Sequence, residues 1–440
     1  MFIFTSLFLT VLGIGLLIQL WLLQRHQHHV QMHRDKVPEA FSRKIPLDEH
    51  QKAADYTDSK IKIGRLKLIY GTVLLLVWTL GGGIELLDQL WQKASLGEMV
   101  SGIGLILSLS LLSGALELPF SLWQTFVLKE RFGFNKTTLK RYILDLLLQI
   151  MLMLLLAVPL LLAVLALMES AGAFWWLAAW AVLIGFMLVM TWTYPTLIAP
   201  LFNKFTPLEE GELKTRINGL LKRCGFSSKG IFIMDGSKRS GHGNAYFTGF
   251  GKNKRIVFFD TLAESLEGDE MEAVLAHELG HFKRRHVLKH LILITLFTLV
   301  GFALLSWLAN QPWFCRALGV SGQSNALAIL LFMLVIPVFT QFLQPVMALL
   351  SRRHEFEADD FAVSQAGAEP MIRALAKLYR ENASTLTPDP LYSAFHDSHP
   401  PASVRVAHLS ANIAANQQHG EKRQYETVHF NSTAYDFYIQ

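Results

Sequence analysis

The sequence has little cysteine and little charge. Only two of its 440 residues are cysteine, Cys224 and Cys315, and they lie in dissimilar segments. Two such thiols exclude a disulfide framework and a thiolate metal site. Charged residues make up 17% of the chain, hydrophobic residues make up 52%, and the mean hydropathy is +0.33. A composition this apolar excludes an ordinary water-soluble protein and indicates several membrane spans.

Seven apolar segments are each long enough to cross about 30 Å of hydrocarbon. The first has neither a basic start nor a small-residue cleavage site, so we interpret it as a membrane helix and not a removed signal peptide. Glu117, at the end of the third, either lines an internal cavity or reaches the membrane interface. The segments are 1–24, 67–88, 99–121, 146–168, 174–194, 288–310 and 326–350.

Basic residues gather in alternate loops. Residues 25–65 contain nine Lys or Arg and residues 128–141 contain five, whereas the opposing loops contain at most one. Basic loops stay cytoplasmic, so we expect the N-terminus outside and the hydrophilic segments 200–286 and 351–440 in the cytoplasm. These basic loops beside the lipid bilayer account for the net charge of +5, so no nucleic-acid partner is expected.

The hydrophilic segments predict a mixed helical and stranded domain. Gly and Asn separate three strand-like runs, which favours a small antiparallel sheet. Thr206-Pro207 resembles a helix start. Strands are expected at 231–234, 245–248 and 255–259, and helices at 352–366, 370–381 and 401–415. The predicted fold class is mostly α: seven spans joined to a cytoplasmic α+β domain, divided as 1–199, 200–286, 287–350 and 351–440.

Residues 277–281 read His-Glu-Leu-Gly-His on a helical pattern without proline. On a helix, His277 and His281 lie about 40° apart around the axis and one turn apart along it. Two imidazoles on one face can bind the same Zn²⁺. Glu278 is next to the first ligand, where it can act as general base toward a water. The motif therefore predicts one zinc ion and peptide-bond hydrolysis.

Zinc held by two histidines needs a third protein ligand. His286 and His290 fall about 180° and 220° around the helix from His277, so we expect both to face away and to form a basic interfacial patch. We expect the 277–281 helix to run straight into the sixth span. The sixth and seventh spans then form a hairpin that returns the chain to the same membrane surface near residue 355.

Glu355 and Asp359 lie four residues apart and share a helix face. One of them can bind the metal while the other accepts a hydrogen bond from a ligand histidine. Spacing alone does not choose between Glu355 and Glu357 as the ligand.

Further motifs extend over nearly the whole chain. They include Phe-Gly-Phe-Asn at 132–135, Ile-Ala-Pro-Leu-Phe-Asn-Lys-Phe at 198–205, Asn-Ala-Tyr-Phe-Thr-Gly at 244–249 and Leu-Tyr-Ser-Ala-Phe-His-Asp-Ser-His-Pro-Pro at 391–401. With these, the sequence resembles the type I C-a-a-X prenyl endopeptidases, seven-helix membrane zinc metalloproteases. In other members Tyr often stands where this chain has Asp397, and Ser is common where it has Gly243.

The resemblance implies that Glu355 is the third zinc ligand and Asp359 its neighbour that orients a histidine. It implies a chamber inside the membrane with the zinc site at its cytoplasmic end. It also implies an edge strand on which a substrate backbone pairs, formed by Asn244, Ala245, Tyr246 and Phe247. His399 and Arg405 are implied at the active site, where His399 can donate to an oxyanion and Arg405 can orient a substrate carbonyl or a neighbouring carboxylate.

The predicted function is a zinc-dependent membrane endopeptidase in a bacterial inner membrane or the endoplasmic reticulum. Its expected partners are membrane-associated or lipidated peptides and proteins, with membrane-protein quality control as a role in a bacterium. A catalytically silent zinc scaffold would lack the general base, and Glu278 is present. A channel or transporter would carry polar residues throughout the spans, and another membrane protease, of the heat-shock type, would have fewer spans.

Overall fold

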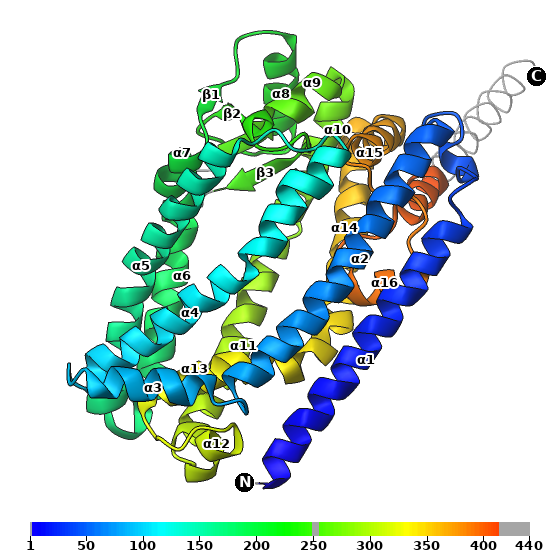
Figure 1. The fold of residues 1–440 in the computed structure, drawn as a ribbon. Helices are drawn as coiled ribbons and strands as arrows, with labels where there is room; N and C mark the ends of the chain where they lie inside the picture. Colours follow the sequence, from blue (N-terminus) through cyan, green and yellow to red (C-terminus); the bar gives the residue numbers. More distant parts are fainter. Residues whose placement is uncertain (1, 249–254, 413–440) are drawn as a thin grey trace, which may run out of the picture.

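Long apolar helices form most of the molecule, and a smaller helical and stranded part covers one end (Figure 1). The computed structural model describes residues 2–248 and 255–412. Its longer helices outside that end are α1 Phe2–Met32, α2 Leu47–Trp78, α3 Gly83–Lys93, α4 Glu98–Trp123, α5 Leu139–Ser170, α6 Trp175–Thr193, α11 His286–Ala309, α13 Asn325–Thr340 and α14 Gln344–Ala366. Short 3-10 or π-helical segments are η1 Glu39–Phe41, η2 Gln124–Lys129, η3 Gly172–Phe174, η4 Tyr194–Ile198, η5 Gly236–Lys238 and η7 Gln341–Leu343.

Six helices within the described residues are long and apolar enough to cross a membrane, or seven if one bent pair counts as a span. The bent pair is α2 and α3, which meet at 47°. The break lies at Gly81–Gly83, where Gly82 adopts a φ of +81° that favours glycine. The predicted segment 67–88 runs through this bend, so the count of seven depends on how the pair sits in the membrane.

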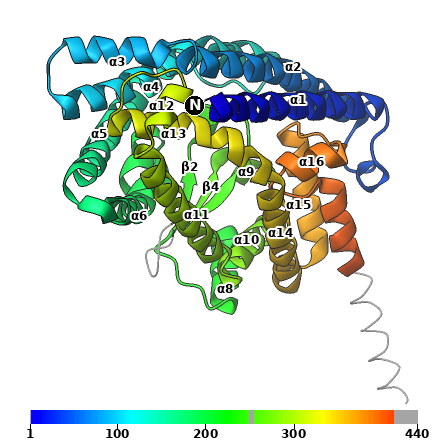
Figure 2. The same cartoon turned by 90° about the horizontal axis from the view of Figure 1, so that it is seen from below.

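Viewed from below, α1, α2 and α4 lie along one side, α5 and α6 along the next, and α11 and α14 across from α1, with α13 beside α1 (Figure 2). Gly102 allows α4 to lie close to α13, because a Cβ at this position would be only 2.6 Å from the Cβ of Ala326. Glu117 pairs with Lys67 at 3.2 Å, and both side chains are half exposed. Close contacts at small residues, such as Gly102 with Ala326, give the dispersion energy that holds membrane helices together where no water is displaced.

The sheet has four strands in the order β1-β2-β4-β3. They are β1 Phe205–Pro207, β2 Ile231–Met234, β3 Ala245–Thr248 and β4 Arg255–Phe259. The prediction of a wholly antiparallel sheet is wrong, because β2 pairs with β4 in parallel. Strand β3 runs antiparallel to β2 but leaves a gap beside it, and β4 then inserts between the two, parallel to β2 and antiparallel to β3.

The predicted helix start at Thr206-Pro207 is also wrong. Both residues lie in β1, where they pair with Ile233 and Phe232 of β2. Strand pairing overrides the local helix signal, and proline fits an edge strand because it has no N–H to donate. The helix begins later, as α8 Glu212–Arg223.

The remaining helices surround the sheet or connect the spans. They are α7 Ala199–Phe202, α9 Asp260–Ser265, α10 Gly268–Lys283, α12 Pro312–Ala317, α15 Ala368–Glu381 and α16 Pro390–His396, with residues 402–412 also helical. The helices expected at 352–366 and 370–381 are confirmed. Of the helix expected at 401–415, residues 413–415 lie outside the described residues, as does Gly249 of the motif at 244–249.

The expectation that the 277–281 helix continues directly into the next span is wrong. Helix α10 begins with a capping box between Glu267 and Glu270 and ends at Lys283. Arg285 then adopts a left-handed φ of 58°, and α11 starts at His286. This break turns the chain between the two helices and changes which residues face the site.

Candidate active site and metal centre

Close packing of α10 against α14 builds the centre of the site. Gly280 makes this packing possible, because a Cβ at its position would lie 2.9 Å from the Cα of Ala358. The contact brings together one ligand atom from each of His277, His281 and Glu355, all within 4.8 Å of one another. Two of these residues come from α10 and one from α14, as the predicted helix hairpin requires.

The three side chains point their lone pairs at a common point. The two Nε2 atoms of His277 and His281 are 3.3 Å apart, and each lies 3.4 Å from a carboxylate oxygen of Glu355. Oε2 of Glu355 is buried and has no hydrogen-bond partner. A buried carboxylate oxygen without a partner is costly, and a divalent cation with a preference for imidazole and carboxylate ligands fits this donor set.

Asp359 and Arg405 hold the His277 ring from behind. The Nδ1 atom of His277 is 2.8 Å from Asp359, and Nε of Arg405 donates to the same carboxylate at 2.9 Å. Because Asp359 can only accept, His277 donates from Nδ1 and leaves the Nε2 lone pair for the cluster. Burial lowers the pKa of His277, but the neighbouring carboxylates of Asp359 and Glu355 outweigh it and raise the pKa to about 9.

The ring of His281 is held by a residue that the sequence analysis had placed elsewhere. His286 is buried and its Nδ1 lies 3.0 Å from Nδ1 of His281, so the prediction that it faces away is wrong. Its Nε2 lies 3.0 Å from Glu357, and its ring stacks on His354 at 4.1 Å between centroids. The carboxylate fixes the direction of this chain: His286 donates to Glu357 and His281 donates to His286.

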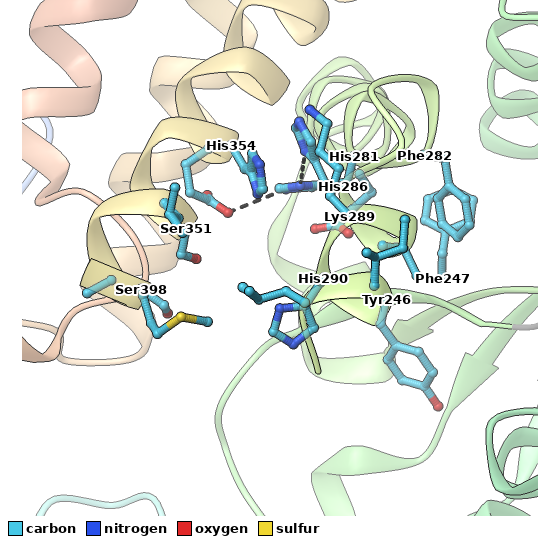
Figure 3. A pocket seen from close by; sticks show the side chains of 18 of the residues that line it. Tyr246, Phe247, His281, Phe282, His286, Lys289, His290, Ser351, His354 and Ser398 are labelled. Atoms are coloured by element: carbon cyan, nitrogen blue, oxygen red, sulfur yellow. Dashed lines mark hydrogen bonds and ion pairs between the residues drawn. The ribbon is translucent and has the colours of Figure 1, made fainter. Parts of the chain in front are cut away.

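No pattern in the sequence predicts the contact between His286 and His281. A straight helix would place His286 opposite His277, and the break at Arg285 contains neither proline nor glycine. His290 lies one turn further along α11 and lines the neighbouring cavity (Figure 3).

Glu278 lies at the border between the histidine cluster and a cavity of about 1040 Å³. The cavity is also lined by Tyr246 and Phe247, by His281 and by apolar side chains of α11 (Figure 3). Burial raises the pKa of the Glu278 carboxyl above its usual range. A carboxylate with a raised pKa is a stronger base, which suits proton transfer from a water.

Strand β3 is an edge strand, since only β4 pairs with it among the described residues. Ala245, Tyr246 and Phe247 lie within it. Asn244 immediately precedes it, accepts from the backbone N–H of Phe259 at 2.9 Å and is exposed. The free backbone edge can therefore accept an added peptide strand.

His399 approaches the cluster from the other side. Its Nε2 lies 3.5 Å from Glu355, and 61% of its side chain is exposed. Its Nδ1 is within 3.0 Å of the Ser398 hydroxyl. Arg405, in contrast, is buried and contacts Asp359 and Glu355, so it faces neighbouring carboxylates.

Comparison with known proteins accounts for nearly the whole chain. A family model described as CAAX prenyl protease N-terminal, five membrane helices, matches residues 26–204, and one for peptidase family M48 matches residues 207–413. The chain is 35% identical to CAAX prenyl protease 1 homolog of Oryza sativa subsp. japonica, over 83% of this chain and 88% of that protein. It is 33% identical to CAAX prenyl protease 1 of Saccharomyces cerevisiae, over 87% and 90%.

A solved structure agrees with these sequence matches. The crystal structure of S. mikatae Ste24p superposes with a TM-score of 0.84 at 31% identity, and the match covers 92% of this chain and 98% of that one. At this identity and coverage, the two proteins share a family as well as a fold.

A bundle of apolar helices that carries a His-Glu-x-x-His helix and a converging glutamate defines a multi-pass membrane metallopeptidase. The chain belongs to the CAAX prenyl protease family, peptidase family M48. It is a zinc-dependent endopeptidase, as the sequence predicted, and the channel and heat-shock-type alternatives are not supported.

Proposed function

We propose that His277, His281 and Glu355 hold one zinc ion and that Glu278 is the catalytic base. The observation that carries the proposal is the convergence of three ligand atoms within 4.8 Å beside an unpartnered buried oxygen of Glu355. Zinc supplies a lowered pKa for water and a polarised peptide carbonyl when it is bound. The residues of the chain provide position, proton transfer and the exclusion of bulk water.

Glu278 takes a proton from the attacking water and passes it to the amine that leaves. Its burial beside the cavity keeps it basic enough for the first step. His399 lies on the far side of the cluster, 3.5 Å from Glu355, where its ring N–H donates to the oxyanion that forms on the carbonyl. Arg405 acts as a positioning residue, because it holds Asp359, which in turn orients His277.

The substrate lies as an added strand along Asn244, Ala245, Tyr246 and Phe247. Backbone hydrogen bonds to an edge strand give affinity without requiring a fixed sequence. The relatives are named CAAX prenyl proteases, and we extend to this chain a peptide or protein substrate that is membrane-associated or lipidated. The cavity of about 1040 Å³ next to Tyr246 and Phe247 would take its apolar part.

We further propose seven spans around an intramembrane chamber, with α2 and α3 together as one span. The basic loops favour an N-terminus outside and a catalytic part in the cytoplasm, in a bacterial inner membrane or the endoplasmic reticulum. The chain then divides into five helices at 1–199, a first catalytic part at 200–286, two helices at 287–350 and a second catalytic part at 351–440.

Zinc content and peptide cleavage of the purified protein, beside Glu278→Gln, test the proposal. We expect about one zinc per chain in both proteins and cleavage of a fluorogenic peptide only by the wild type, because the amide cannot accept the proton. Equal zinc without cleavage by either protein would favour the silent scaffold. No zinc in either protein would contradict the ligand assignment.

A further inference from the structure

An accessible lysine lies where two cavities meet beside the substrate strand. Lys60 of α2 lines a cavity of about 530 Å³ that also reaches His399. It lines a second one, of about 510 Å³, that reaches Gly243 and Asn244. Of the residues that the structure describes, only Ser384 also lines both cavities. Lys60 thus stands between the proposed oxyanion donor and the start of the edge strand.

The charge of Lys60 is not neutralised by a neighbour in contact. Its ammonium nitrogen lies 4.5 Å from the centre of the Tyr56 ring. Within residues 2–248 and 255–412, no carboxylate comes within 4.0 Å of it. Asp397 lines the larger of the two cavities and acts on Lys60 from beyond that distance. Burial raises the pKa of the Asp397 carboxyl and lowers the pKa of the Lys60 ammonium, so each shifts toward its neutral form. An ammonium group in such a recess is matched best by an anion from a ligand.

The two ends of β3 meet different surroundings. Tyr246 and Phe247 line the large cavity, together with apolar side chains such as Ile292 and Leu296. Asn244, at the other end, lines the polar cavity of Lys60. A peptide that pairs antiparallel with β3 runs from Phe247 toward Asn244, so its C-terminal end arrives at Lys60.

We propose that Lys60 binds a carboxylate of the bound peptide, and we assign it to the free α-carboxylate at the peptide's C-terminus. The inference rests on the proposed function, since it requires a substrate strand on β3. The Ser384 hydroxyl, which lines both cavities, adds a hydrogen-bond donor. The contact makes Lys60 a specificity-determining residue, because it fixes the position of the peptide's end relative to the cluster.

The test is the ratio of kcat/KM for two forms of one internally quenched peptide that ends in Cys-aliphatic-aliphatic-Met. One form has a free C-terminal acid and the other a carboxamide, so they differ by one charge. We expect the wild type to prefer the acid by about tenfold to a hundredfold, as for a hydrogen-bonded charge pair. Lys60→Met should abolish this preference, and Lys60→Arg should retain part of it.

Lys62→Met is the matched control. Lys62 lies two residues further along α2, is exposed and pairs with Asp58 at 2.7 Å, so its replacement changes the same charge while leaving the preference intact. A third peptide, amidated but ending in Glu, separates the two sources of a carboxylate. Cleavage of it at the rate of the free acid would overturn the assignment to the α-carboxylate.

The ratio is measured within each protein, so a partly unfolded variant does not distort it. Equal cleavage of acid and amide by the wild type, or an acid preference that persists in Lys60→Met, would overturn the inference and leave the proposed function standing. Failure of the wild type to cleave either form would instead contradict the proposed function.

Discussion

The two histidines proposed as metal ligands differ in what holds the ring nitrogen that faces away from the cluster. His277 is held by the carboxylate of Asp359, and His281 by another histidine, His286, which in turn contacts Glu357. Such outer contacts fix the ring tautomer and orientation, and their loss weakens metal binding. The arrangement for His281 requires a neutral His286 ring, because Nδ1 of His286 must accept a hydrogen bond while its Nε2 donates one.

We therefore expect His286→Ala to lower zinc affinity by about 10-fold to 100-fold, because His281 loses the acceptor for its Nδ1–H. Glu357→Gln should cost less, since the amide oxygen can still accept from His286. Competition with a chelator measures both. His290→Ala serves as the control because His290 lies one turn further along α11. An affinity for His286→Ala equal to that control would show that His286 does not position the ligand.

A second prediction at this scale concerns pH. The raised pKa of His277, about 9, means that its ring is protonated at pH 7 in the metal-free protein, and zinc must displace that proton. Apparent zinc affinity should therefore rise with pH up to about 9. For the wild type the rise between pH 7 and 9 should be about tenfold per pH unit, because one proton is displaced. Asp359→Asn removes a cause of the raised pKa, so the zinc affinity of this variant should rise less steeply over the same range. Parallel profiles for the two proteins would refute this.

At the scale of elements, the contact between α10 and α14 decides whether a site exists. Gly280 lies against Ala358, and a methyl group there would push the helices apart. We expect Gly280→Ala to cost about 1–3 kcal/mol of stability, as overpacking does, and to lower zinc content because Glu355 moves away from the histidines.

Gly219→Ala provides the comparison for thermal unfolding in detergent. Gly219 lies in α8, and a Cβ there would meet only the end of the Arg223 side chain, at 3.6 Å. Alanine favours helix over glycine by about 1 kcal/mol, so this variant should unfold at the same temperature as the wild type or higher. If Gly280→Ala unfolds at the same temperature as Gly219→Ala, the close contact between α10 and α14 does not contribute to stability as proposed.

At the scale of the whole molecule, the proposed orientation can be tested with single cysteines. Cys224→Ser and Cys315→Ala give a background without thiols, into which Ser95→Cys and Lys136→Cys are introduced separately; both positions are exposed. An impermeant maleimide added to intact cells or sealed vesicles should label Ser95→Cys from outside. It should reach Lys136→Cys only after permeabilisation, because that loop is basic and cytoplasmic. The opposite pattern would reverse the topology.

Several features of the molecule could be predicted because each depends on local spacing. Residues four apart on a helix share a face, so His277 with His281, and Glu355 with Asp359, could be paired from the sequence. Long uncharged segments have few alternatives to membrane helices, so the spans were recognised from composition and length. The choice of Glu355 over Glu357 came from the family resemblance, and it agrees with the ligand cluster in the structure.

The errors share a physical cause, which is contact between residues distant in the sequence. Thr206 and Pro207 carry a helix signal, but pairing with β2 draws them into a strand. The parallel pairing of β2 with β4 depends on the path of the chain between them, which turn residues do not specify. The break at Arg285 places His286 beside His281, where an uninterrupted helix would have kept them apart.

The sequence by itself determined the chemistry, because metal ligands, general base and membrane spans are written in residue type and local periodicity. Only the tertiary structure decided how the strands pair, which partner orients the His281 ring, and where the charge of Lys60 lies. These depend on the approach of α10, α14, α2 and β3, which are separated by up to hundreds of residues along the chain. Packing between such elements is set by the shapes of whole surfaces, and no single local motif contains that information.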